Sequence, residues 1–541
     1  MSLFFIVGGK MQIVGKKGVG GELLSGLLGG TLSLTVSSLV VKLLGLIYKI
    51  PLASILGDEG MGYFNSAYTV YAFFYLLCTA GVPKAVMILV SEAKAAGRAD
   101  IERKIVRIAS ILFLSLGAIL TAIFIIFSAP LAAVIGNSRS AYTMLAIAPS
   151  IIFISLAGVI RGYLSANMLL LDVAVSQVIE GAGKLAIGLL FAMVGKGMNM
   201  PLEIISAMTI LGVTLGAGLG LLYLFICSKI KIKNEKAGQK ENKQANREII
   251  KRILFISIPI TVSAAIMSMT NIIDLGLIMR SLTEVGYAES EASALYGNYT
   301  TLAVPMFNLA VSIITPVSVA YLPLLTRCAA SGDTEGLIRA ERSSLDFTAI
   351  LSAPMTVGMV VFAKEILGLL FPGSEVRLGA SLLVLIAPAI PFSSLLLVTN
   401  TAFEAQGRVK APLVSMIFGS IAKVIVSLVL ITKTDLGILG APIGTFATYT
   451  ISLLISLIIY GKRFKRSLPI IKTYLPSYLV AIAAIMLARA VYDWLYYVID
   501  GRALILISIA LAALIYLGLL TFFGILSSKK IGELAKYTKR G

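Results

Sequence analysis

The sequence predicts an all-α polytopic membrane protein with about fourteen transmembrane helices, and three observations carry this prediction. First, 58% of the 541 residues are apolar and 13% are charged, with a mean hydropathy of +0.95, whereas soluble domains carry about 25% charged residues. Second, the apolar residues form continuous runs of the roughly 20 residues that a membrane helix needs. Third, two stretches 239 residues apart are similar. Soluble enzymes, disordered chains and secreted disulfide scaffolds are excluded.

The expected spans are apolar runs that end at charged residues, glycine or proline. Their number is even, so both termini are expected on the same side of the membrane. The runs lie near 31–56, 64–91, 105–128, 141–164, 172–195, 204–227, 252–280, 294–326, 345–366, 379–403, 411–432, 438–460, 473–492 and 503–526.

Basic residues are distributed unevenly over the loops between these runs. The termini and the even-numbered loops hold about 31 lysines and arginines, whereas the odd-numbered loops hold six. Loops rich in Lys and Arg remain in the cytoplasm, so we expect both termini there. Topology and anionic inner-leaflet lipids then account for the net charge of +19, and no nucleic acid is needed as a partner.

The chain contains an internal repeat with an offset of 239 residues. Residues 147–149 read Ile-Ala-Pro, as do residues 386–388, and the same offset pairs Lys184 with Lys423. Each repeat holds an even number of spans, so both enter the membrane from the same side and are related by an axis along the membrane normal. Rocking one bundle against the other would expose the space between them to each side in turn.

The repeat also predicts the domain organisation. Six spans form an N-terminal lobe, a basic cytoplasmic linker follows, six spans form a C-terminal lobe, and two spans with the C-terminal tail form an appendage. These parts cover residues 1–228, 229–251, 252–461 and 462–541.

The rare residues exclude several chemistries. The chain has no histidine, and Cys78, Cys227 and Cys328 are far apart, so neither a metal site nor a disulfide framework is indicated. No nucleotide-binding G-x-x-x-x-G-K-[ST] motif occurs. We therefore expect a transporter without a cofactor rather than an enzyme or an ATP-driven pump.

Basic residues inside the apolar runs are the first candidates for a binding site, because a charge near the bilayer centre costs about 3 kcal/mol. Lys42 and Lys49 share one helix face, since seven residues correspond to nearly two turns, and Pro51 is expected to end or kink that helix. For Arg161 and Arg280, near the predicted helix ends, snorkelling to the surface is the competing interpretation. The cation candidates are Lys42, Lys49, Arg161, Lys184 and Arg280.

Polar residues in two spans are candidates for ion coupling. Gln177, Glu180 and Lys184 follow one another at spacings of three and four, which fits either a self-neutralising Glu–Lys pair or a polar stripe that faces the cavity. Asn271 and Asp274 share a face of a later span. They could bind Na⁺ or carry a proton, or Asp274 could pair with a nearby lysine. A net positive cavity calls for an anionic guest, and lysine binds phosphate as a mobile point charge.

Several segments resemble the stage V sporulation protein B family. This family belongs to the multidrug/oligosaccharidyl-lipid/polysaccharide exporter superfamily, which also includes MurJ-type lipid II flippases and MATE antiporters. The similar segments are 42–51, 56–63, 80–83, 161–163, 176–180, 295–300 and 400–407.

The resemblance implies a two-lobed, MATE-like bundle in the bacterial cytoplasmic membrane that flips an undecaprenyl-pyrophosphate-linked saccharide by alternating access. Lipid II, the peptidoglycan precursor, is the first choice of substrate. Teichoic acid, O-antigen or exopolysaccharide units are alternatives. Anionic lipids and cell-wall synthesis proteins are candidate partners. Glu404, within the segment 400–407, is a further coupling candidate, and the driving force is Na⁺, H⁺ or the membrane potential.

Two other classes of protein remain as alternatives. A multidrug cation antiporter of the same architecture would need a net acidic cavity, whereas this chain offers mostly Lys and Arg inside its spans. A scaffold protein would not need lysines in the middle of the membrane, and an enzyme of envelope synthesis would need clustered acid and base groups on a cytoplasmic loop.

Overall fold

The computed structural model describes residues 19–231, 243–372, 374–408, 410–496 and 501–525, and these residues form helices without any β-strand. Eleven helices within them are long and apolar enough to cross a membrane, or twelve when the bent pair Val376–Ile386 and Ala389–Ala405 is one span. The all-α membrane fold is thus confirmed. The number of fourteen spans stays a prediction. It would be reached if the first arm of α1, which reverses direction, and α8 each counted as one further span.

The helices of the first bundle precede the linker. They are α1 (Val19–Thr79), α2 (Val82–Ala95), α3 (Ala99–Ile135), α4 (Ser140–Ile147), α5 (Ser150–Ala166), α6 (Leu170–Gly197) and α7 (Leu202–Lys231).

The remaining helices follow the linker. They are α8 (Lys243–Glu284), α9 (Glu289–Asn298), the π-helix η1 (Tyr299–Ala303), α10 (Val304–Ser331), α11 (Thr334–Val361), α12 (Ala363–Leu370), α13 (Val376–Ile386), α14 (Ala389–Ala405), α15 (Lys410–Lys433), the 3₁₀-helix η2 (Gly437–Leu439), α16 (Gly440–Phe464), α17 (Ile470–Leu495) and α18 (Gly501–Phe522).

Helix α1 consists of two arms that fold back on each other at Gly57. This residue has φ +63°, a conformation that glycine adopts without steric cost. The rings of Tyr48 and Phe64, on opposite arms, have centroids 6.1 Å apart, although a straight helix would separate them by about 24 Å. The predicted helix end at Pro51 is wrong: Pro51 lies inside the helix, and the chain turns six residues later, whereas the alternative of a kink at Pro51 stays a prediction.

The repeat is visible in the shape of two broken helices. Helix α4 ends at Ile147 and α5 begins at Ser150, whereas α13 ends at Ile386 and α14 begins at Ala389. The two helix ends, Ile147 and Ile386, are 239 residues apart, as are the two helix starts, Ser150 and Ala389. Both breaks contain an Ala-Pro step. Proline lacks the N–H that a continuous helix would use, so the same two residues interrupt the corresponding helix in each bundle.

Helix α8 connects the two bundles. It packs against α1, α2 and α3 of the first bundle and also against α15 of the second. A methyl group added to Gly81 would lie 2.3 Å from the carbonyl oxygen of Ser257, so only glycine permits this approach of α2 to α8. Arg252 of α8 also forms an ion pair with Glu92 of α2, at 2.6 Å.

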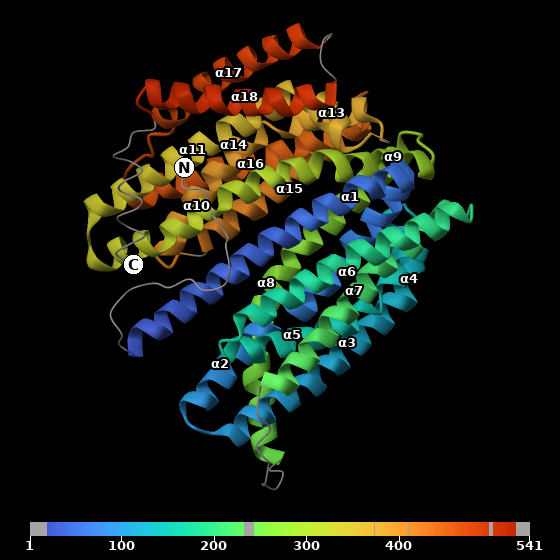
Figure 1. Ribbon diagram of the computed structural model, residues 1–541, viewed down its shortest axis with the longest axis vertical. Helices are drawn as coiled ribbons and strands as arrows, with labels where there is room; N and C mark the ends of the chain where they lie inside the picture. The colour runs from blue at the N-terminus through green and yellow to red at the C-terminus, as the bar shows by residue number, and fades with distance from the viewer. Residues whose placement is uncertain (1–18, 232–242, 373, 409, 497–500, 526–541) are drawn as a thin grey trace.

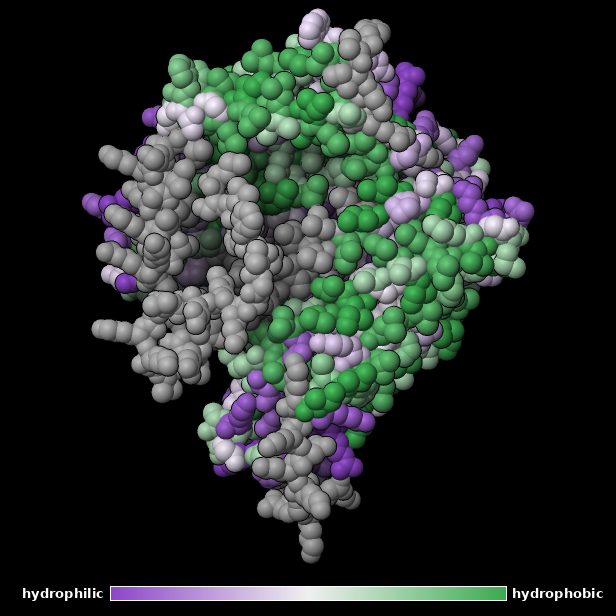
Figure 2. All heavy atoms as spheres, in the orientation of Figure 1, coloured by the Kyte–Doolittle hydropathy of each residue, from purple (hydrophilic) through white to green (hydrophobic). Residues whose placement is uncertain are grey.

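Figure 1 shows the two bundles close together where α1 and α9 meet and further apart at the opposite end. The surface is hollowed between the bundles, with apolar side chains along the upper and right-hand rim of the hollow (Figure 2). We call the end at Gly57 and the start of α9 the closed end. Helices α17 and α18 lie at the outside of the second bundle, where α17 packs against α11.

Candidate functional site

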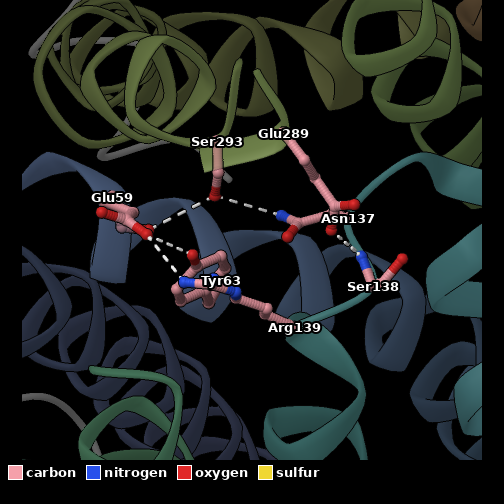
Figure 3. Close-up of polar contacts among 7 residues, drawn as sticks. All are labelled: Glu59, Tyr63, Asn137, Ser138, Arg139, Glu289 and Ser293. Atoms are coloured by element: carbon pink, nitrogen blue, oxygen red, sulfur yellow. Dashed lines mark hydrogen bonds and ion pairs between the residues drawn. The ribbon is translucent and has the colours of Figure 1, made fainter. Parts of the chain in front are cut away.

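A network of polar side chains joins the two bundles at the closed end (Figure 3). The amide of Asn137, in the loop after α3, donates to the hydroxyls of Ser66 (2.9 Å) and Ser293 (3.2 Å). Ser293 belongs to α9 and donates to the carbonyl of Glu59 at 3.3 Å. The Glu59 carboxylate accepts from Tyr63 and lies 3.7 Å from Arg139. One buried serine of the second bundle is thereby bonded to two segments of the first.

Glycines allow the backbones of α1 and α9 to approach closely at this end. A methyl group on Gly62 would lie 2.0 Å from the carbonyl oxygen of Ser293, and one on Gly297 would lie 2.0 Å from that of Asp58. Further out, the Asp58 carboxylate accepts from Asn298 (3.0 Å) and from the backbone N–H of Glu375 (3.1 Å). Direct packing and hydrogen bonds thus close this end.

The inner limit of the closed end is formed by contacts between α1 and η1. Asn65 donates to the hydroxyl of Thr301 at 2.8 Å, and the Lys49 ammonium donates to the carbonyl oxygen of Thr300 at 3.1 Å. Lys49 and Asn65 are each eight residues from Gly57, on opposite arms of α1, which is about 12 Å along the helix. π-Helical turns are frequent at functional sites, and this one accepts the hydrogen bond from Lys49.

Lys184 of α6 lies just beyond these contacts. Its ammonium is 4.4 Å from the ring centroid of Tyr68 and 5.5 Å from that of Tyr48, distances at which the face of an aromatic ring attracts a cation. Tyr68 is eleven residues from Gly57, about 16 Å along the helix from the turn. Its side chain is 38% exposed, one turn beyond the bond from Asn65 to the second bundle.

Lys49 and Lys184 form what we call the lysine pair. Their ammonium groups are close enough to repel each other, and neither forms an ion pair with a carboxylate among the residues that the structure describes. The site therefore has positive charge that no carboxylate of the described residues compensates. An anion that bound both groups would relieve this repulsion.

Three tyrosines extend from the lysine pair along the second arm of α1. Tyr68, Tyr71 and Tyr75 have neighbouring ring centroids 5.7 and 6.0 Å apart. The sequence reasoning did not identify this stripe as part of a site, although spacings of three and four place the rings on one helix face. The stripe leads from Lys184 toward Glu180, which lies near Tyr71 and Tyr75.

Glu180 is neutralised by Arg161, not by Lys184. An Arg161 N–H donates to the Glu180 carboxylate at 2.7 Å, and a second donates to Ser176 at 3.1 Å. The i,i+4 pair between Glu180 and Lys184, one of the two arrangements considered for span five, is therefore absent, whereas the polar stripe facing the cavity stays a prediction. The Glu180 carboxylate is taken by Arg161 of α5, and Lys184 lies instead over the rings of Tyr48 and Tyr68.

We expect the Arg161–Glu180 pair to behave as a structural unit. Removing one partner of a buried pair leaves an uncompensated charge and costs about 3–5 kcal/mol, so Glu180→Leu should lower the melting temperature of the detergent-purified protein markedly. The double variant Arg161→Met/Glu180→Leu should be more stable than either single variant, since it buries no lone charge. If the decrease in melting temperature of the double variant equalled the sum of the decreases in the two single variants, the two groups would act independently.

The remaining candidates have different surroundings. Lys42 lies on the first arm of α1, and its side chain is outside the described residues. Arg280 is exposed and donates to the carbonyl of Val134 at 2.6 Å, so it does not join the cluster. Gln177 is half-buried on α6. Asn271 on α8 and Glu404 at the end of α14 are exposed.

Asp274 forms an ion pair with Lys423 of α15 at 2.8 Å. Lysine pairing was one of the arrangements that the sequence left open for Asp274. The intramembrane acids Glu180 and Asp274 are thus both neutralised by basic residues, whereas the lysine pair is not. An organic cation would meet net positive charge here, which argues against a multidrug cation antiporter.

The architecture is an all-α, two-bundle membrane fold of the MATE-like kind. A solved structure of the lipid II flippase MurJ in an inward closed conformation superposes with a TM-score of 0.69, at 16% identity over 91% of this chain and 98% of that one. An inward-facing multidrug resistance MATE family transporter of the MOP superfamily gives a TM-score of 0.63, at 16% identity over 80% of this chain and 98% of that one.

Sequence comparison specifies the family within this class. The family model of the lipid II flippase MurJ matches residues 52–517, so the chain belongs to the MurJ family. Stage V sporulation protein B of Bacillus subtilis (strain 168) is 26% identical over 521 residues, which cover 93% of this chain and 96% of that protein. The protein is therefore a bacterial membrane transporter of the flippase type and not an enzyme.

Proposed function

We propose that this protein flips an undecaprenyl-pyrophosphate-linked saccharide, with lipid II as the substrate, across the cytoplasmic membrane. The observation that carries the proposal is the lysine pair, two ammonium groups without a carboxylate partner among the described residues, at the place where α1 meets η1 of the second bundle. A pyrophosphate offers two adjacent anionic groups, and charge-assisted hydrogen bonds to such groups are about twice as strong as neutral ones.

Binding of the pyrophosphate can be linked to opening of the closed end through Lys49. In the present conformation the Lys49 ammonium donates to the Thr300 carbonyl and so joins α1 to η1. A phosphate oxygen is a stronger acceptor than this neutral carbonyl, so a guest at the lysine pair draws Lys49 away from Thr300. The guest then weakens a contact that holds the two bundles together, as alternating access requires.

The orientation follows from the distribution of basic residues. Both termini and the 229–251 linker lie in the cytoplasm, because Lys- and Arg-rich loops remain there. The closed end at Gly57 then faces outward, and the hollow between the bundles faces the cytoplasm. This is the side on which a lipid-linked precursor made from cytoplasmic nucleotides is loaded.

Complementation in vivo tests the proposed substrate. Expression of this chain should restore growth to a bacterial strain depleted of its own lipid II flippase. The control experiment expresses the same chain in a strain that lacks the exporter of a lipid-linked O-antigen or teichoic acid unit. Rescue of that strain alone would assign the chain to another undecaprenyl-linked saccharide, and rescue of neither strain, with protein present in the membrane, would contradict the proposal.

A further inference from the structure

The two lysines that the repeat relates have opposite surroundings. Lys184 of α6 lies over the rings of Tyr48 and Tyr68. Lys423 of α15, its equivalent 239 residues later, donates to the Asp274 carboxylate at 2.8 Å. One bundle thus presents a cation that is available to a guest, and the other presents a cation whose charge is already compensated.

The Asp274 carboxylate has the features of a cation site. The side chains of Asp274 and Lys423 are 15% and 16% exposed, and the second carboxylate oxygen of Asp274 is buried without a hydrogen-bond partner. The Tyr299 hydroxyl shares a hydrogen bond of 3.0 Å with Thr445 and lies in the electrostatic surroundings of Asp274, and Asn271 lies one turn away on α8. Carboxylate, hydroxyl and amide oxygens are ligands that suit hard cations.

Lys423 already fills the position that such a cation would take. A free ion can bind Asp274 only by displacing an ammonium group that is tethered beside it, and tethered groups act at effective concentrations in the millimolar range or above. The displaced ammonium would then be left uncompensated inside the membrane, which costs several kcal/mol. An exchangeable Na⁺ therefore has no vacant site at Asp274 while Lys423 is present.

We propose that Lys423 is a built-in counter-ion that replaces a coupling cation at Asp274, so that this protein transports without Na⁺ exchange at the α8–α15 contact. Removal of the ammonium group uncovers a Na⁺ site formed by Asp274 and its oxygen-bearing neighbours. The statement about binding is independent of the substrate. The statement about transport rests on the proposed function, and it leaves the membrane potential, which acts on the charged head group, as the driving force.

Thermal unfolding of the full-length protein in detergent tests the binding statement, with NaCl replaced stepwise by choline chloride at constant ionic strength. The wild-type protein should show no Na⁺-specific shift in melting temperature. Lys423→Met should gain a shift of about 2–4 °C at saturating Na⁺, because a ligand that binds only the folded state stabilises it. Lys423→Met/Asp274→Asn should lose this shift again.

Each arm of the experiment can overturn the proposal. A Na⁺-specific shift in the wild-type protein would show that Lys423 does not exclude the ion. Absence of a shift in monodisperse Lys423→Met would show that no cation site exists beneath the lysine, and Lys423→Gln provides a second uncharged variant if the methionine variant aggregates. A shift that persists in the double variant would locate the ion away from Asp274.

The transport statement has its own measurement. Flipping of fluorescent lipid II in liposomes by the wild-type protein should proceed at rates within about twofold of each other in Na⁺ and in choline, and a rate that requires Na⁺ would overturn it. The thermal assay uses no lipid-linked substrate. A protein that fails to flip lipid II but shows the expected cation behaviour would therefore contradict the proposed function and leave the cation site intact.

Discussion

Alanine at either Lys49 or Lys184 is expected to reduce lipid II transport about 10- to 100-fold, because each substitution removes a hydrogen bond to a charged group worth about 1.5–3 kcal/mol. The quantity to be measured is the initial rate of leaflet exchange by purified protein in liposomes. Arginine should retain most of the rate at either position, since it keeps the charge. Glutamate should abolish transport because it repels the pyrophosphate.

The matched control is Lys433→Ala, which removes an exposed lysine at the end of α15. This variant should transport at the wild-type rate and reach the membrane in the same amount. Wild-type rates for both Lys49→Ala and Lys184→Ala would mean that the lysine pair is tolerated in the membrane without binding the guest, and the anion site would have to lie elsewhere.

Cross-linking α1 to α9 at the closed end is expected to stop transport completely, because alternating access requires this end to open. Asp58 and Asn298 meet across the two bundles at 3.0 Å, so Asp58→Cys/Asn298→Cys can be joined by a short bis-methanethiosulfonate reagent, which forms a disulfide with each cysteine, after the three native cysteines have been replaced. Transport should return when the link is reduced with dithiothreitol.

A control pair distinguishes trapping from general damage by the reagent. Lys94 and Asn167 form a hydrogen bond of 2.9 Å within the first bundle, so Lys94→Cys/Asn167→Cys should accept the same link and remain active. Undiminished transport by the linked Asp58/Asn298 variant would show that the closed end does not need to open.

The orientation of the closed end can be tested with the same cysteine. An impermeant reagent should reach the cysteine at position 58 from outside intact cells if this end faces outward.

The features that the sequence predicted well are those encoded by local pattern and by repetition. Continuous apolar runs predicted the all-α membrane fold, and the Ala-Pro steps at 148–149 and 387–388 coincide with breaks at equivalent places in two helices. The turn in α1 was harder to place. Pro51 was the obvious breaker, but membrane helices tolerate proline, and it is Gly57 that adopts positive φ.

The pairing of charges could not be predicted, because it depends on helices that are distant in sequence. Spacing along α6 suggested a bond between Glu180 and Lys184, but Arg161 approaches from α5 and takes the carboxylate. In the same way, Lys423 reaches Asp274 across 149 residues of chain. Only the packed arrangement of α5 against α6 and of α15 against α8 shows which lysine remains uncompensated.

The central claim is that the lysine pair binds the pyrophosphate of a lipid-linked saccharide during flipping. The most direct measurement compares leaflet exchange of fluorescent lipid II with that of a neutral lipid of the same chain length, in liposomes that contain wild-type protein or Lys49→Ala/Lys184→Ala. The account predicts rapid exchange of lipid II by the wild type, none above background by the double variant, and none of the neutral lipid by either. Equal exchange of lipid II by both proteins, or equal exchange of the neutral lipid by the wild type, would contradict it.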